Sequence, residues 1–201
     1  MTTRPLRPLL LALALAGAAA SLEATAASPY GVNAHAPQGQ DLARLFDQLQ
    51  AAGIGWVRID FEWTAIEPQQ DAFRWQIYDA IVAGAEMRGL QVLGILAYTP
   101  AWATDGAPRT GVPRQTADWE DLCFRAAARY RGRVRAWEMW NEPNLDHFFA
   151  GSRTQYIERI LKPGARAVRA ADPGALVGGP GLAHLTSGDS DWYRWLVETV
   201  G

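Results

Sequence analysis

Cysteine and histidine are scarce in this sequence. Its 201 residues contain one cysteine, Cys123, and three histidines. A single cysteine excludes a disulfide within the chain, and its apolar position in an expected helix predicts a buried, unreactive thiol. The histidines His35, His147 and His184 are far apart and lack the spacing of metal ligands. We therefore expect no metal ion and no other cofactor.

Clustered charge of either sign is also lacking. The formal net charge is −2, and the 19 lysine and arginine residues are spread along the chain. Proteins that bind nucleic acids or anionic membranes carry basic patches, so neither is an expected partner. No glycine-rich phosphate-binding loop follows the first expected strand, which counts against a nucleotide-binding sheet.

The longest apolar run lies at the N-terminus. Arg4 and Arg7 precede the apolar stretch 9–20, and the small residues 24–26 follow it. This order is typical of a secretory signal peptide. We therefore predict a signal over residues 1–27, export to the periplasm or the cell exterior, and no membrane attachment once the signal is removed. The run is too short to span a bilayer. The alternative is an N-terminal segment of a cytosolic protein.

Residues 28–201 are expected to belong to a single domain. They are numerous enough for one substantial core, but fewer than the roughly 250 residues of a complete eight-stranded α/β barrel. Nine tryptophans are many for this length. Because sugar rings stack on indole faces, part of this excess favours a carbohydrate-binding protein.

Short apolar runs alternate with segments of helical periodicity from Tyr30 onward. This alternation predicts parallel strands joined by crossover helices. We expect strands over residues 30–33, 54–61, 90–97, 134–141 and 175–180, and helices over residues 41–53, 75–88, 116–130, 152–171 and 191–200. Five such units in succession fit either a barrel or a doubly wound sheet.

Two of the expected helices begin at residues suited to capping. Asp41 and Thr116 precede the first and third helices, and their side-chain oxygens can accept hydrogen bonds from the exposed backbone N–H groups. In the fourth helix, Pro163 and Gly164 predict a break or a kink, since proline has no amide hydrogen to donate.

The stretch 137–144 reads Trp-Glu-Met-Trp-Asn-Glu-Pro-Asn and spans the end of a buried strand. Glu142 therefore lies at the strand end, near tryptophans and beside Asn141, where burial raises a carboxyl pKa toward the range of a general acid. A proton-donating carboxyl, a second carboxylate and a neutral amide that binds a sugar hydroxyl are suited to cleaving a glycosidic bond. The alternatives are a helix-capping or solvated glutamate and a turn asparagine.

This stretch resembles the fourth-strand signature of the retaining (β/α)8 glycoside hydrolases of clan A. Other segments are similar, in the same order, to family 39 and its family 5-like bacterial relatives: Gly31–His35, Trp56–Phe61, Ile66–Pro68 and Leu93–Ala103. The similarity extends from about Tyr30 to the C-terminus. The resemblance favours the barrel over the doubly wound sheet, and it implies a partial (β/α)8 TIM barrel with about the first five βα units.

The resemblance implies catalytic roles for three residues. Glu142 matches the general acid/base of the family, and Asn141 matches the residue that hydrogen-bonds the sugar 2-hydroxyl. Arg58 matches an arginine that lies beneath the catalytic carboxylates and supports them. Because burial of Arg58 in an apolar strand requires a carboxylate partner, a pair with Glu138 would make its role structural instead.

Four residues are expected to contact the substrate. His35 follows the first strand, Tyr98 and Trp102 follow the third, and Trp140 lies near the end of the fourth. The alternatives are a plain loop position for His35 and core packing for Tyr98 and Trp102. Because side chains alternate along a strand, a position of Trp140 at the barrel mouth places Trp137 outward against the helices.

The nucleophile of clan A lies on the seventh strand, whereas this chain ends after its fifth expected strand. No residue of the chain is therefore assigned as nucleophile. We interpret the chain as the N-terminal portion of a secreted retaining glycosidase for β-linked poly- or oligosaccharides, and we expect no activity from the 201 residues alone. The alternative is a secreted carbohydrate-binding protein without catalysis. The sugar, its linkage and the oligomeric state are left open.

Overall fold

The computed structural model describes residues 28–34, 41–184 and 190–200. The predicted signal peptide, residues 1–27, lies outside the described residues, and so does His35. Within the described ranges, no helix combines the length and the apolar character that crossing a membrane requires.

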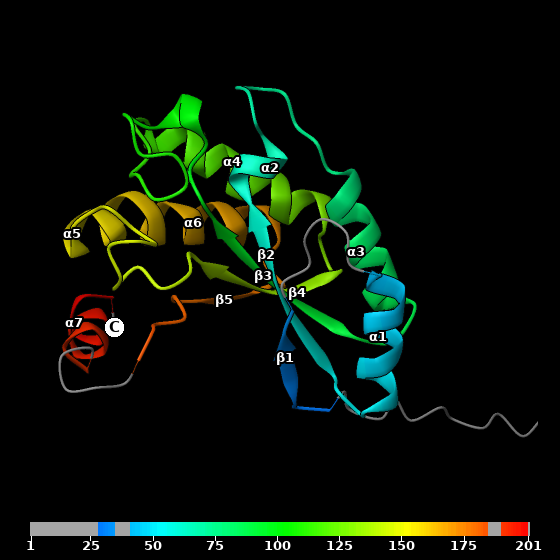
Figure 1. Ribbon diagram of the computed structural model, residues 1–201. Coiled ribbons are helices and arrows are strands. Elements are labelled where there is room, and N and C mark those ends of the chain that lie inside the picture. Colours follow the sequence, from blue (N-terminus) through cyan, green and yellow to red (C-terminus); the bar gives the residue numbers. More distant parts are fainter. Residues whose placement is uncertain (1–27, 35–40, 185–189, 201) are drawn as a thin grey trace, which may run out of the picture.

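Five parallel strands form one sheet (Figure 1). They are β1 (Gly31–Asn33), β2 (Trp56–Glu62), β3 (Gln91–Ala97), β4 (Val134–Met139) and β5 (Leu176–Gly178). The strands lie side by side in the order of the sequence, and every neighbouring pair is parallel. A doubly wound sheet reverses its strand order at a switch point. The sequential order therefore excludes that alternative and confirms a partial (β/α)8 barrel.

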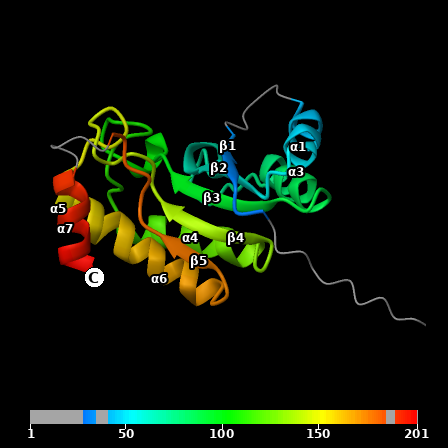
Figure 2. The same ribbon diagram turned by 90° about the horizontal axis from the view of Figure 1, so that it is seen from below.

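The helices of the described residues are α1 (Leu42–Ala51), α2 (Trp63–Ile66), α3 (Gln76–Glu86), α4 (Thr116–Arg129), α5 (Arg153–Tyr156), α6 (Lys162–Ala171) and α7 (Ser190–Val200). A 3₁₀ turn, η1 (Ala101–Ala103), follows β3, and a π-helical segment, η2 (Ile157–Leu161), joins α5 to α6. The helices α4 and α6 lie side by side (Figures 1 and 2).

The two faces of the sheet differ in burial. Along β2, residues alternate between fully buried and half-buried positions. The buried side chains Val57, Ile59 and Phe61 face the helices, since Phe61 stacks on Tyr78 of α3 with ring centroids 4.7 Å apart. On the opposite face, residues from all five strands, Arg58 among them, line a cavity of about 430 Å³. This second face is concave, as the interior of a barrel requires.

The expected strands and helices are all present, with boundaries shifted by a few residues. Asp41 caps α1 as predicted, because its Oδ1 accepts from the backbone N–H of Arg44 at 3.1 Å. The cap predicted at Thr116 is wrong. Thr116 is the first residue of α4, and its Oγ1 accepts instead from Arg159 Nε at 3.0 Å. The helix α2, which lies within the expected loop after β2, was not predicted.

The irregularity predicted at Pro163 and Gly164 takes the form of η2, which ends just before them. Pro163 has no N–H to donate to the preceding turn, so the regular helical ladder is interrupted there. At Gly164, a Cβ atom would lie 2.6 Å from Met139 Sδ and 2.9 Å from Trp119 Nε1. Glycine therefore allows α6 to approach β4 and α4 closely.

The thiol of Cys123 lies in this core between α4 and α6. It is free and fully buried, and burial raises its pKa well above the usual range. The prediction of a buried thiol is confirmed, and the thiol remains protonated at neutral pH.

Candidate active site

Three residues at the carboxyl ends of β3 and β4 have unusual backbone conformations. Tyr98, Trp140 and Glu142 have φ angles of 73°, 76° and 46°. Positive φ is uncommon for residues other than glycine, and such conformations cluster at functional sites. These residues mark the strand ends where the sequence places the site.

Backbone hydrogen bonds hold Glu142 at this rim. Its N–H donates to the Gly181 carbonyl at 2.8 Å, and its own carbonyl accepts from the N–H of Leu145 at 3.0 Å. Asn141 forms a parallel bridge with Gly181, so pairing between the segments of β4 and β5 continues past the strand ends. The half-buried Glu142 is therefore attached to a defined framework.

Asn144 secures the same framework from the other side. Its Nδ2 donates to the Ala183 carbonyl at 2.8 Å, and its Oδ1 accepts from the Ala183 N–H at 3.1 Å. This double contact fixes the segment after β5 against the segment that carries Glu142.

Arg58 on β2 connects β1 and β4 across the concave face. Its Nε and Nη2 donate to Glu138 Oε2 at 3.0 and 2.6 Å, and Nη2 also donates to Asn141 Oδ1 at 3.0 Å. Its Nη1 donates to Asn33 Oδ1 on β1 at 3.2 Å. The Arg58 and Glu138 side chains are 22% and 16% exposed, so the ion pair is only partly screened by water. Arg58 thus has the predicted carboxylate partner and also contacts the candidate site residue Asn141.

Gly181 lies directly above this ion pair. A Cβ at this position would lie 2.9 Å from Arg58 Nη2 and 3.7 Å from Glu138 Oε2. A larger residue would displace the guanidinium, and with it the contact to Asn141.

Tyr98 lies beneath the rim rather than on an open wall. It is 6% exposed, and its ring meets that of the buried Trp140 edge to face with centroids 6.0 Å apart. Burial, together with the negative charge of Asp60, raises the pKa of Tyr98 to about 12. The guanidinium of Arg109 covers its ring at 4.5 Å from the centroid. Direct contact of Tyr98 with a sugar stays a prediction.

Trp140 does not line the barrel mouth, and that prediction is wrong. The side chain is fully buried, its Nε1 donates to the Phe148 carbonyl at 3.0 Å, and its ring contacts Trp119 of α4 with centroids 5.9 Å apart. The φ of 76° breaks the strand alternation and turns the indole toward the helices. Trp137 faces the same side, as predicted, with its ring 5.0 Å from that of Phe61.

Trp102 keeps a partly exposed ring above the third strand. Its Nε1 donates to the Glu67 carbonyl at 2.8 Å, and its ring meets Trp63 edge to face at 5.7 Å. Its role as a substrate contact stays a prediction.

The Glu67 side chain is buried and accepts from Trp63 Nε1 at 2.7 Å and from the Asp71 N–H at 2.8 Å. Glu67 therefore holds the loop together, and burial raises its pKa.

Sequence reasoning missed an ion pair at the same rim. Arg109 Nη1, from the loop after β3, donates to Glu62 Oε2 at the end of β2 at 2.7 Å. The sequence could have pointed to Glu62, because this carboxylate lies at the end of an expected strand. Nothing local pointed to Arg109, because the loop that carries it folds back through an antiparallel bridge between Thr99 and Arg109.

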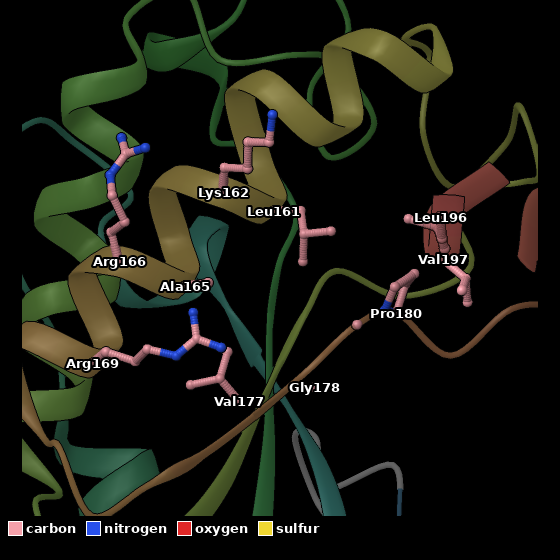
Figure 3. A pocket seen from close by; sticks show the side chains of 11 residues that line it. Leu161, Lys162, Ala165, Arg166, Arg169, Val177, Gly178, Pro180, Leu196 and Val197 are labelled. Carbon is pink, nitrogen blue, oxygen red and sulfur yellow. The ribbon is translucent and has the colours of Figure 1, made fainter. Parts of the chain in front are cut away.

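A second cavity, of about 750 Å³, lies away from these groups (Figure 3). It is formed by α6, β5 and α7. Its lining combines apolar residues with Lys162, Arg166 and Arg169 and includes no carboxylate. This lining therefore offers neither of the two carboxyl groups that glycosidic cleavage uses. Among the described side chains, no group of three or more His, Cys, Asp or Glu residues is placed to hold a metal ion.

Comparisons with known proteins match this chain to a family and to a fold. The sequence profile described as "Cellulase (glycosyl hydrolase family 5)" matches residues 20–191. A β-xylosidase from Geobacillus stearothermophilus is 33% identical over 87 residues, which cover 40% of this chain and 17% of that protein. Endo-1,4-β-xylanase C from Phanerodontia chrysosporium is 30% identical over 125 residues, which cover 57% of this chain and 30% of that protein. The chain thus spans less than a third of either relative.

The fold is similar to that of a solved family 39 enzyme from Xanthomonas axonopodis pv. citri. The TM-score is 0.67 at 22% identity, over 84% of this chain and 38% of that structure. Similarity at this level of identity concerns the fold, and it supports the assignment of a partial barrel.

Proposed function

The chain belongs to the cellulase family, glycosyl hydrolase family 5, and from this premise we propose that it is the N-terminal part of a secreted, retaining clan A glycosidase. The proposed substrates are β-linked poly- or oligosaccharides. The observation that carries the proposal is the position of Glu142 at the carboxyl end of β4, beside the Arg58–Glu138–Asn141 network.

In the proposed reaction, Glu142 donates its proton to the leaving glycosidic oxygen while a second carboxylate attacks the anomeric carbon. The resulting glycosyl ester is then hydrolysed by water, which transfers a proton to the Glu142 carboxylate as it attacks. Asn141 binds the sugar 2-hydroxyl, and Arg58 holds the Asn141 amide in place. Enzymes of clan A carry the nucleophile on the seventh strand. We therefore assign the second carboxylate to a strand beyond β5 and to none of the described residues.

The names of the relatives suggest which substrates to test first. One is a β-xylosidase and the other an endo-1,4-β-xylanase, so aryl β-xylosides and xylo-oligosaccharides are the proposed substrates for a form extended through eight strands. We expect the 201-residue chain alone to give no detectable hydrolysis. Turnover by the short form at the rate of the extended form would contradict this.

Substitution Glu142→Gln in the extended form tests the acid role. The variant should lose far more activity on substrates with poor leaving groups than on activated aryl glycosides, because only poor leaving groups require the proton. The exposed Glu158 on η2, paired with Lys162, offers a matched control, and Glu158→Gln should leave both rates unchanged. Equal losses on both substrates in Glu142→Gln would remove the assignment.

Sugar binding without catalysis is the second function to consider, and the half-buried ring of Trp102 near the rim favours it. Binding of an oligosaccharide by the 201-residue chain, unaffected by Glu142→Gln and without product from the extended form, would select this alternative.

A further inference from the structure

The cavity of about 750 Å³ lies on the other face of the sheet from the candidate active site. Its strand residue Val177 pairs in register with Trp137, whose ring contacts that of Phe61 on the helical side. Residues paired in register point to the same face of a sheet, so the cavity lies on the helical side of β5. The network of Arg58 and Asn141 lies on the concave side. A ligand of this cavity would therefore bind independently of the proposed function.

The way in which α7 is attached leaves this cavity open. Near the start of α7, the Trp192 ring lies 5.9 Å from that of Tyr156, and the Arg153 guanidinium lies 5.3 Å from the Trp192 centroid. Further along the helix, Leu196 and Val197 line the cavity, and Val197 is 67% exposed. The volume is within the range of about 300–1,000 Å³ that is typical of small-molecule sites. This wall of the cavity is suited to an apolar group.

The facing wall, on α6, carries three cations. Lys162 Nζ donates to Glu158 Oε1 at 2.7 Å, and Arg166 Nη2 donates to Glu120 Oε1 at 2.8 Å. Within the described ranges, the guanidinium of Arg169 has neither a carboxylate partner nor a hydrogen-bond acceptor. Figure 3 shows the Arg169 side chain extending from α6 toward β5, whereas Lys162 and Arg166 point away from the strand. Arg169 is therefore the cation available to a ligand.

We propose that this cavity binds a small amphipathic anion, namely a carboxylate that carries an apolar chain. The carboxylate pairs with Arg169, whose guanidinium can donate two parallel N–H groups to it. The chain lies against Val177 and Leu196 and covers apolar surface that water otherwise contacts. The lining contains no carboxylate that would repel the anion. The ligand thus differs in chemistry from the neutral sugar proposed for the rim.

Three probes separate the contributions of charge and apolar chain. Octanoate, 1-octanol and acetate are titrated into the ¹⁵N-labelled 201-residue chain. Octanoate should shift the backbone signals of Val177 and Val197 to saturation, 1-octanol should bind more weakly because it lacks the charge, and acetate should give no saturable shift. The proposal is overturned if octanoate gives no saturable shift, if 1-octanol binds as tightly, or if the shifts appear instead at Val32 and Leu93 of the concave cavity.

Substitution of the exposed Arg169 tests its role as the partner of the anion. Arg169→Gln should weaken octanoate binding about twofold to fivefold, as expected for one ion pair partly open to water, and leave 1-octanol binding unchanged. Arg169→Lys keeps the charge and should restore part of the affinity. Arg44→Gln, at an exposed position on α1, is the control that should change neither. Unchanged octanoate affinity in Arg169→Gln, or equal weakening of both probes, would overturn the proposal.

Discussion

The two faces of the sheet have different roles. The helix-facing side of β2 is entirely apolar and buried, with Val57, Ile59 and Phe61 at zero exposure. The concave side of the same strand carries Arg58, whose side chain is 22% exposed and bonded to residues of β1 and β4. Because side chains alternate along a strand, one short sequence supplies both the core and the site. The buried face sets the position of the strands, and the strands set the distances between the polar groups.

The strongest test of this contrast removes a large side chain from each face. Phe61 contacts Tyr78, Tyr130 and Trp137, with ring centroids at 4.7, 5.5 and 5.0 Å. Phe61→Ala should lower the free energy of unfolding by about 3–5 kcal/mol, since it leaves a cavity in a packed core. Leu93 on the concave face is only partly buried, and Leu93→Ala should cost clearly less. Urea unfolding of both variants measures the difference, and equal losses would mean that the two faces contribute alike.

A smaller effect is expected from the ion pair on the concave face. Glu138→Gln leaves the Arg58 cation without its carboxylate and should cost about 1–3 kcal/mol in unfolding free energy. The matched control is Glu86→Gln, because Glu86 pairs with Arg133 at the same 2.6 Å but with side chains about 40% exposed. Exposed pairs contribute about 0–1 kcal/mol, so the control should lose less. If Glu138→Gln lowers the unfolding free energy no more than the control does, the ion pair on the concave face contributes no more to stability than an exposed ion pair.

The smallest effect concerns a charge on the outer, helical layer. Asp79 on α3 accepts from Arg129 Nε at 2.8 Å and Nη2 at 2.6 Å, and the Arg129 hydrogen bonds are the main cause of its lowered pKa. A carboxyl whose folded-state pKa is depressed stabilises the fold above its ordinary value of 3.8, and this contribution is lost as the pH falls through the folded-state pKa.

Asp79→Asn should therefore lower the melting temperature slightly at pH 7, and the difference from the unmodified protein should shrink below about pH 4. Since the side chain is 39% exposed, the effect at pH 7 should stay under about 1 kcal/mol. Melting curves between pH 3 and 7 provide the measurement. A difference in melting temperature that grows toward low pH would contradict the lowered pKa of Asp79.

Local patterns were enough to predict the strands and part of the site, whereas the choice of a barrel, and with it the sequential strand order, came from the resemblance to clan A. The alternation of apolar runs predicted every strand, and the cost of burying Arg58 predicted its carboxylate partner. Trp140 was misplaced because a positive φ at the strand end cancels the alternation on which the prediction depended. The ion pair between Arg109 and Glu62 depends on the loop after β3 folding back, and no spacing along the chain encodes it.

In the function proposed above, a β-linked sugar binds at the rim of β2, β3 and β4 on the concave side rather than in the cavity formed by α6, β5 and α7. Titration of ¹⁵N-labelled protein with xylobiose tests this most directly. Backbone signals of Asn141 and Glu142 should shift with a common dissociation constant, while those of Arg166 and Val197 should stay in place. Shifts confined to Arg166, Val197 and their neighbours would contradict it.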